Sequence, residues 1–130
     1  MGSVRGIQDR FASRQLGTGA RHAASTMRRA IEPAVATVFE VDIEDLRAPT
    51  RGSPRAAFAR QVAMYLAHVT CGATLTEIGV LFERDRTTVA HACGVVEDRR
   101  DDPDLDGKLD YLERAVSCLI DALSFGPGRR

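Results

Sequence analysis

Residues 74–96 read TLTEIGVLFERDRTTVAHACGVV, and this stretch decides the fold of the chain. Its first four residues, Thr74 to Glu77, have the spacing of a capping box, in which a threonine hydroxyl and a glutamate carboxylate bind the backbone N–H groups that open a helix. Apolar residues follow at positions 78, 81 and 82, so the pattern predicts a short buried helix over 75–82.

A second helix is predicted over 86–99, after a turn of three residues. Asp85 is a candidate N-cap for this helix. The residues on its apolar face are Val89, Ala92, Cys93 and Val96. Two short helices joined by a tight polar turn, after a longer helix, have the layout of a helix-turn-helix. In that motif the second helix enters the major groove of DNA by its N-terminal end.

The segments around this motif also have helical patterns. Ser53 is a candidate N-cap, and Pro54 suits the first position of a helix that runs to Gly72. The remaining segments are a helix near 31–40, an acidic turn at 42–46, a loop at 47–52 and a last amphipathic helix over 105–123. The sequence therefore predicts an all-α protein, a compact bundle of about six helices that contains the helix-turn-helix.

The length of 130 residues fits one domain and excludes a second full one. Residues 1–28 are rich in arginine and hold few, widely spaced apolar residues, so we expect a mobile Arg-rich arm there. The folded helix-turn-helix domain is expected over 29–125. Residues 126–130 begin with Gly-Pro-Gly and are expected to form a frayed tail.

The net charge of zero is a sum of blocks with opposite signs. Eighteen basic residues balance eighteen acidic ones. Residues 1–31 hold six arginines and one aspartate, and residues 32–46 hold five acidic residues. Residues 47–91 form a basic island with six arginines against three acidic residues, and an acidic flank follows at 92–106. A total of zero therefore does not exclude a nucleic-acid partner.

Three cysteines, odd in number and set in apolar runs, are typical of reduced thiols in a cytosolic protein. No apolar stretch is long enough to span a membrane and no apolar leader is present, so we expect a cytoplasmic protein.

A zinc site can be drawn from His68, Cys71, His91 and Cys93. We reject it because His91 and Cys93, two residues apart, point away from each other on a helix. A Cys/His hydrolase has no support, because no base and nucleophile stand at a recognisable spacing. No metal, cofactor or small-molecule substrate is expected.

The start of the second motif helix carries side chains that can read base edges. Arg86 can donate to guanine O6 and N7, and Asp85 can accept from cytosine N4. The methyl groups of Thr87 and Thr88 can contact a thymine methyl. The alternative is structural, with Asp85 serving only as an N-cap and the two threonines only as exposed helix residues.

Residues 84–93, RDRTTVAHAC, resemble the recognition-helix signature of the DNA-binding domain of the bacterial replication initiator family DnaA, which runs close to RDHTTVLHAC. The likeness extends upstream through ARQVAMYLAHVTCGATLTEIG at 59–79 and through VATVFEVDIEDLRAPTR at 35–51. It covers roughly residues 31–115.

The resemblance implies a set of DNA contacts. Asp85, Arg86, Thr87 and Thr88 match the residues that read the family's box in the major groove, and Arg51 matches an arginine that enters the minor groove, with Arg47 and Arg55 as competitors for that role. The implied contacts to the DNA backbone are Arg47, Arg55, His68, Leu75, Thr76, Arg84 and His91. Two departures point to weaker affinity or an altered box preference. The turn is one residue shorter than usual, and Gly94 replaces a basic residue.

The only lysine is Lys108, so the chain contains no G-x-x-x-x-G-K-[ST] loop for nucleotide phosphates. We therefore expect a free-standing DnaA-related protein that is not an enzyme. Its expected function is sequence-specific binding of double-stranded DNA at DnaA-box-like sites, at the nucleoid, which regulates replication initiation or transcription. The alternative is a protein-interaction module that modulates the replication initiator or its inactivating factor without needing DNA.

Overall fold

The computed structural model describes residues 18–48 and 52–124. Within these residues the chain is built from helices alone, as the sequence predicts. The helices are α2 (Thr18–Phe39), α3 (Ile43–Arg47), α4 (Pro54–Val69), α5 (Leu75–Phe82), α6 (Arg86–Arg99) and α7 (Pro103–Ser124).

Three helices begin where the sequence predicts them, and two of these starts have a side-chain cap. The hydroxyl of Ser53 accepts a hydrogen bond from the backbone N–H of Ala56 at 3.1 Å and opens α4. The capping box of α5 is complete. The N–H of Thr74 donates to Oε1 of Glu77 at 2.8 Å, and the N–H of Glu77 donates to Oγ1 of Thr74 at 3.1 Å. Helix α6 begins at Arg86, directly after the predicted N-cap Asp85.

Two expectations for the first half of the chain need correction. Helix α2 begins at Thr18, ten residues before the predicted end of the arm at residue 28, because Thr26 and Met27 are already buried in the domain. The acidic turn expected at 42–46 is a short helix, α3, in which Leu46 is buried. Residues 1–17 and 125–130 lie outside the described residues, so the arm and the tail stay predictions there.

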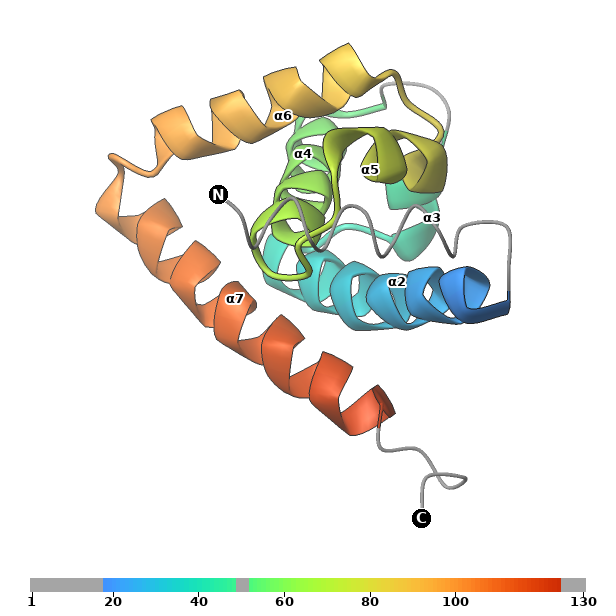
Figure 1. The fold of residues 1–130 in the computed structure, drawn as a ribbon. Coiled ribbons are helices and arrows are strands. Elements are labelled where there is room, and N and C mark those ends of the chain that lie inside the picture. The colour runs from blue at the N-terminus through green and yellow to red at the C-terminus, as the bar shows by residue number, and fades with distance from the viewer. Residues whose placement is uncertain (1–17, 49–51, 125–130) are drawn as a thin grey trace.

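Helix α4 is the centre of the bundle and contacts each of the other five helices. Figure 1 shows α4 enclosed by its neighbours, with α6 running across one end and α7 turning back along α2. The interior side chains of α4 are fully buried, among them Val62 and Leu66. Large side chains from the surrounding helices complete the core, including Ile31, Ile78, Val89, Leu109 and Leu112.

Arg100, at the end of α6, binds three carboxylates of α7. Its Nε lies 2.6 Å from Oδ1 of Asp106, and its Nη1 lies 2.6 Å from Oε2 of Glu113 and 2.9 Å from the hydroxyl of Tyr65. Its Nη2 lies 2.8 Å from Oδ1 of Asp110. Burial acts to lower the pKa of Arg100, but these hydrogen bonds outweigh it and raise the pKa. One arginine therefore neutralises part of the acidic flank and sets the direction of α7.

The turn between α5 and α6 depends on a close approach at Gly79. The N–H of Arg84 donates to the carbonyl of Gly79 at 2.8 Å. A Cβ on Gly79 would lie 2.5 Å from the carbonyl oxygen of Arg84, closer than van der Waals contact allows. The turn itself has a left-handed residue, Glu83, with φ 56 and ψ 51. A glutamate thus takes the conformation that glycine usually supplies in such turns, at a cost of about 1–2 kcal/mol.

We predict that Gly79→Ala lowers the free energy of unfolding by about 1–3 kcal/mol, because the new methyl group pushes the backbone of Arg84 away from α5. The matched control is Gly94→Ala on α6, where a Cβ meets nothing within 4 Å. There the better helix propensity of alanine should raise the stability by about 1 kcal/mol. Urea unfolding followed by circular dichroism measures both, and two equal effects would contradict the close approach.

The cysteines should differ sharply in reactivity. Burial raises the pKa of the Cys71 thiol to about 12, so at pH 8 the thiol stays protonated and the thiolate forms only as the pH approaches that value. Cys118 is exposed on α7. Labelling of the native protein with a thiol reagent at pH 8, followed by peptide mass spectrometry, should modify Cys118 long before Cys71. The denatured protein should show no such order, and equal native rates would refute the prediction.

Candidate nucleic-acid interface

The start of α6 presents the four side chains expected to read bases. Asp85, Arg86, Thr87 and Thr88 are all exposed at one end of the helix. Val89, which lies opposite Thr87 on the helix, is fully buried in the core. The structure thus brings these four residues together at the N-terminal end of α6, which Figure 1 shows at the edge of the bundle above α5.

Asp85 occupies the N-cap position but does not act as a side-chain cap. Its backbone is extended, with φ −65 and ψ 149, and its carboxylate accepts no capping hydrogen bond. The carboxylate is therefore available to a ligand, which weakens the purely structural reading of this residue. The backbone N–H groups of the first turn of a helix also point outward, where they suit an anion such as phosphate.

An open hollow lies between α5 and the start of α6. Thr76 and Val80 contribute from the outer face of α5, and both are exposed. Glu83 and Arg86 border it from the turn and from α6. Leu75, the other residue expected at the DNA backbone, is half-buried. The hollow contains a carboxylate from Glu83, which acts against a phosphate at this position.

The other expected backbone contacts differ in how free their side chains are. His91 is exposed on α6. Arg55 is also exposed, with Nη1 3.9 Å from Oε1 of Glu40. His68 is half-buried, and its Nδ1 lies 2.9 Å from the carbonyl oxygen of Ala73, which fixes its ring over the turn between α4 and α5. His91 and Arg55 are therefore better placed for a phosphate than His68.

Arg47 is held by a buried carboxylate that the sequence analysis did not single out. Glu32 is only 1% exposed, and its Oε1 accepts from Nε and Nη2 of Arg47 at 3.0 and 2.8 Å. Its Oε2 accepts from Nε of Arg28 at 3.0 Å. These hydrogen bonds and the charge of Glu32 raise the pKa of Arg47. The spacing of Arg28 and Glu32, four residues apart on one helix, was a signal for this pair.

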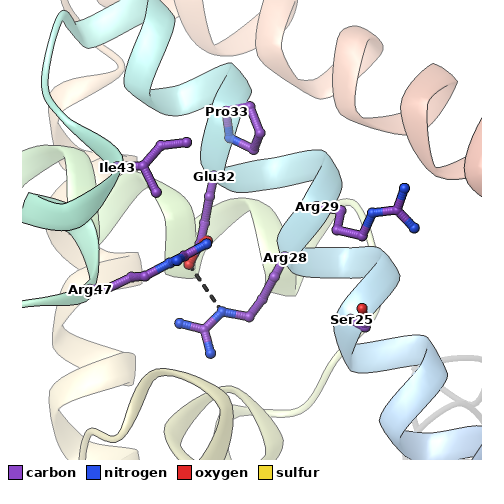
Figure 2. A pocket seen from close by; sticks show the side chains of 7 residues that line it. All are labelled: Ser25, Arg28, Arg29, Glu32, Pro33, Ile43 and Arg47. Atoms are coloured by element: carbon purple, nitrogen blue, oxygen red, sulfur yellow. Dashed lines mark hydrogen bonds and ion pairs between the residues drawn. The ribbon is translucent and has the colours of Figure 1, made fainter.

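Figure 2 shows this cluster at a pocket between α2 and α3. Arg28 and Arg47 point towards Glu32, whereas Arg29 points away from it. The residues that line the pocket are Ser25, Arg28, Arg29, Glu32, Pro33, Ile43 and Arg47. The cluster is a structural brace, because its central acid is already paired with two arginines.

The guanidinium of Arg84 donates hydrogen bonds to backbone carbonyls of the chain itself. Its Nη1 donates to the carbonyls of Phe82 and Glu83, both at 3.1 Å, and its Nη2 donates to the carbonyl of Ala48 at 3.0 Å. Arg51, the candidate for the minor groove, lies outside the described residues. The described residues on either side of it are Ala48, bound by Arg84, and Gly52, which has φ 67.

Among the described residues, no group of three or more histidine, cysteine, aspartate or glutamate side chains could hold a metal ion. In the same part of the chain, every helix is too short or too polar to cross a lipid bilayer.

A model of the family described as the bacterial DnaA protein helix-turn-helix matches residues 29–96, just over half of the chain. The chain belongs to this family. The match ends within α6, so the DnaA helix-turn-helix comprises the end of α2, all of α3 to α5 and most of α6. The family implies DNA binding in the context of a replication initiator.

Several DnaA proteins are similar to this chain. The chromosomal replication initiator protein DnaA 2 of Chlamydia trachomatis is 43% identical over 65 residues, which are 50% of this chain and 14% of that protein. DnaA of Desulfotalea psychrophila is 33% identical over 90 residues, 68% of this chain and 19% of that protein. The chain therefore spans less than a fifth of the length of these relatives.

A solved structure supports the same family. The crystal structure of a DNA replication initiation factor matches with a TM-score of 0.69 and 32% sequence identity. The match covers 78% of this chain and 31% of the other one. The helices of this chain are thus arranged as in that factor over most of the residues that the structure describes.

We predict that Glu32→Gln lowers the free energy of unfolding by about 1–3 kcal/mol, because two arginines lose the charged partner they share. Asp121→Asn on α7 makes the same change of charge at an exposed residue and should leave the stability nearly unchanged. Chemical unfolding of both variants is the measurement. Equal stability of the wild type and Glu32→Gln would show that the cluster does not brace the fold.

Proposed function

We propose that the chain binds double-stranded DNA sequence-specifically at DnaA-box-like sites, and that it regulates replication initiation or transcription there without hydrolysing ATP. The observation that carries the proposal is the exposed start of α6 within a DnaA helix-turn-helix, where the carboxylate of Asp85 makes no capping hydrogen bond. Such a protein acts at the nucleoid, in the cytoplasm.

In the major groove, each of the four residues has a separate role. Arg86 donates to the O6 and N7 atoms of a guanine, and Asp85 accepts from the N4 amino group of a cytosine. Thr87 and Thr88 contact a thymine methyl group or donate from their hydroxyls. Support comes from their exposure together at the end of one helix, next to the fully buried Val89 that anchors this end in the core.

In the minor groove, we assign Arg51 the contact to the A·T-rich part of the box, where a narrow groove has a stronger negative potential. Arg47 is a weaker competitor for this role because Glu32 binds two of its nitrogens.

The DNA backbone contacts come from Arg55, Thr76 and His91, which are exposed, with smaller contributions from Leu75 and His68. Among the described residues assigned to the backbone here, Arg55 is the one exposed arginine, so the part of the affinity that these residues supply should depend only weakly on salt.

The decisive test is fluorescence anisotropy with a labelled duplex that carries a DnaA box and a scrambled duplex of equal length. The wild type should prefer the box. Thr88→Ala should weaken box binding by about 1–3 kcal/mol, because it removes a base contact. Thr37→Ala is the matched control, since Thr37 is exposed on α2 and away from α6.

Equal affinity of the wild type for the two duplexes would overturn specific reading of the box. The absence of any DNA binding at low salt would instead favour the protein-interaction module, and a pull-down of the replication initiator from nuclease-treated lysate would then test that function.

A further inference from the structure

We propose that the outer face of α7 is a self-association surface, on which two copies of this chain pair through antiparallel α7 helices. The apolar residues of this face, which we call the outer stripe, are Tyr111, Ala115, Cys118, Leu119 and Ala122. They lie beyond residue 96, where the match to the DnaA helix-turn-helix ends. The inference goes beyond the proposed function, because the pairing needs no DNA.

Helix α7 has two apolar faces, and its own bundle uses one of them. The inner face is in the core, through the buried side chains of Leu105, Leu109, Leu112 and Val116. At 100° per residue, the outer stripe is centred roughly a third of a turn away from that face. Packing against one core requires a single apolar stripe, so this fold does not need the second one. Figure 1 shows α7 at the margin of the bundle.

The outer stripe is exposed to solvent along most of its length. Tyr111 is 59% exposed and Leu119 is 40% exposed. Cys118 and Ala122 are exposed as well, and Ala115 is half-buried. Tyrosine is enriched at the centre of protein interfaces, where its large ring is buried. A partner that covers this stripe would remove its apolar surface from water, which favours association.

The spacing of the outer stripe fits a second helix. Tyr111, Ala115, Cys118 and Ala122 follow one another at intervals of four, three and four residues. This alternation is the heptad pattern by which one helix packs along another. The three small side chains allow the axis of a neighbouring helix to come close. The occupant of this face is therefore a helix with a matching stripe.

The charges beside the outer stripe select a second copy of this chain. Arg114 and Asp121 are exposed and lie seven residues apart, so they share one flank of the stripe. Neither forms an ion pair with another described residue. Three other carboxylates of α7 differ, because Arg100 binds them. The flank thus presents one positive and one negative charge, and the reversed flank of a second copy complements both.

The charges also set the direction and register of the pair. In an antiparallel pair with Tyr111 opposite Ala122 of the second copy, the large ring meets a small side chain. Arg114 then lies beside Asp121 of the second copy, and the twofold axis repeats this ion pair further along the seam. With parallel helices, the heptad pattern would place Arg114 beside Leu119 of the second copy and leave both charges unpaired. The antiparallel pair is therefore favoured.

The size of the outer stripe makes the dimer weak. From Tyr111 to Ala122 the helix rises by about 16 Å, so the seam is smaller than a standard protein interface. The pair should form only at high protein concentration. In dilute solution, as used for thiol labelling and unfolding, the chain is a monomer in which Cys118 and Asp121 are exposed.

Sedimentation velocity of the full chain without DNA, over a concentration series up to about 1 mM, tests the pairing. The wild type should shift from monomer to dimer. Arg114→Glu or Asp121→Arg alone places like charges side by side twice, so each should weaken dimer formation roughly tenfold. The combined variant Arg114→Glu/Asp121→Arg restores opposite charges and should dimerise like the wild type. Asp98→Arg changes an exposed residue of α6 in the same way and is the matched control.

Disulfide trapping tests the direction of the two helices. In a Cys118→Ser background, Tyr111→Cys and Ala122→Cys together introduce two thiols about 16 Å apart along one helix, too far for a disulfide within the chain. Oxidation should link position 111 of one copy to position 122 of the other. Peptide mass spectrometry identifies the link, and a link between two positions 111 would show a parallel pair.

A wild type that stays monomeric throughout the series would overturn the inference. The same holds for single variants that dimerise like the wild type, for a combined variant that does not recover the dimer, and for a parallel link. All substituted positions are exposed, and far-UV circular dichroism of each variant checks that it is folded. Preference for the box duplex is measured separately, so this inference and the proposed function can fail independently.

Discussion

The buried carboxylate of Glu32 constrains the arrangement of three helices. A carboxylate that is removed from water is costly unless charged donors surround it, and here the donors come from Arg28 on the same helix and Arg47 at the end of α3. Because Arg28 also binds the carbonyl of Leu81, satisfying one acid orients α2, α3 and α5 together. The ion pairs of Glu32 with Arg28 and Arg47 thus support the helix-turn-helix in addition to the apolar core.

The helices with local signals could be predicted from the sequence, and those that depend on packing could not. The N-cap residues of α4, α5 and α6 directly precede these helices, and the side chains of the first two cap them, so the helix starts follow from short patterns. Helix α2 extends beyond its predicted start because Met27 packs into the domain, and α3 is held by Leu46. Met27 lies four residues before Ile31 and so continues the apolar stripe of α2, whereas five residues are too few for a clear periodic pattern in α3.

The same distinction holds for the candidate site, where some features could be predicted from the sequence and others could not. The exposed group from Asp85 to Thr88 follows from helical geometry and could be predicted. The hydrogen bond from Arg84 to Ala48 could not, because the two residues are 36 positions apart and the acceptor is a backbone carbonyl, which no residue pattern reveals. Charge counting fails for a related reason: two arginines of the basic island, Arg47 and Arg84, bind groups within the protein. The basic island therefore offers DNA less positive charge than its composition suggests.

Gly94 has a consequence for how this domain can change over evolutionary time. It lies on the exposed side of α6, and a side chain added there would enter open space. The core places no demand on this position, in contrast to Gly79, where a Cβ would clash with the backbone of the turn. A single codon change at position 94 can therefore add or remove a side chain on the surface of α6 while the fold stays intact. Selection can adjust the surface chemistry of this helix independently of the architecture that supports it.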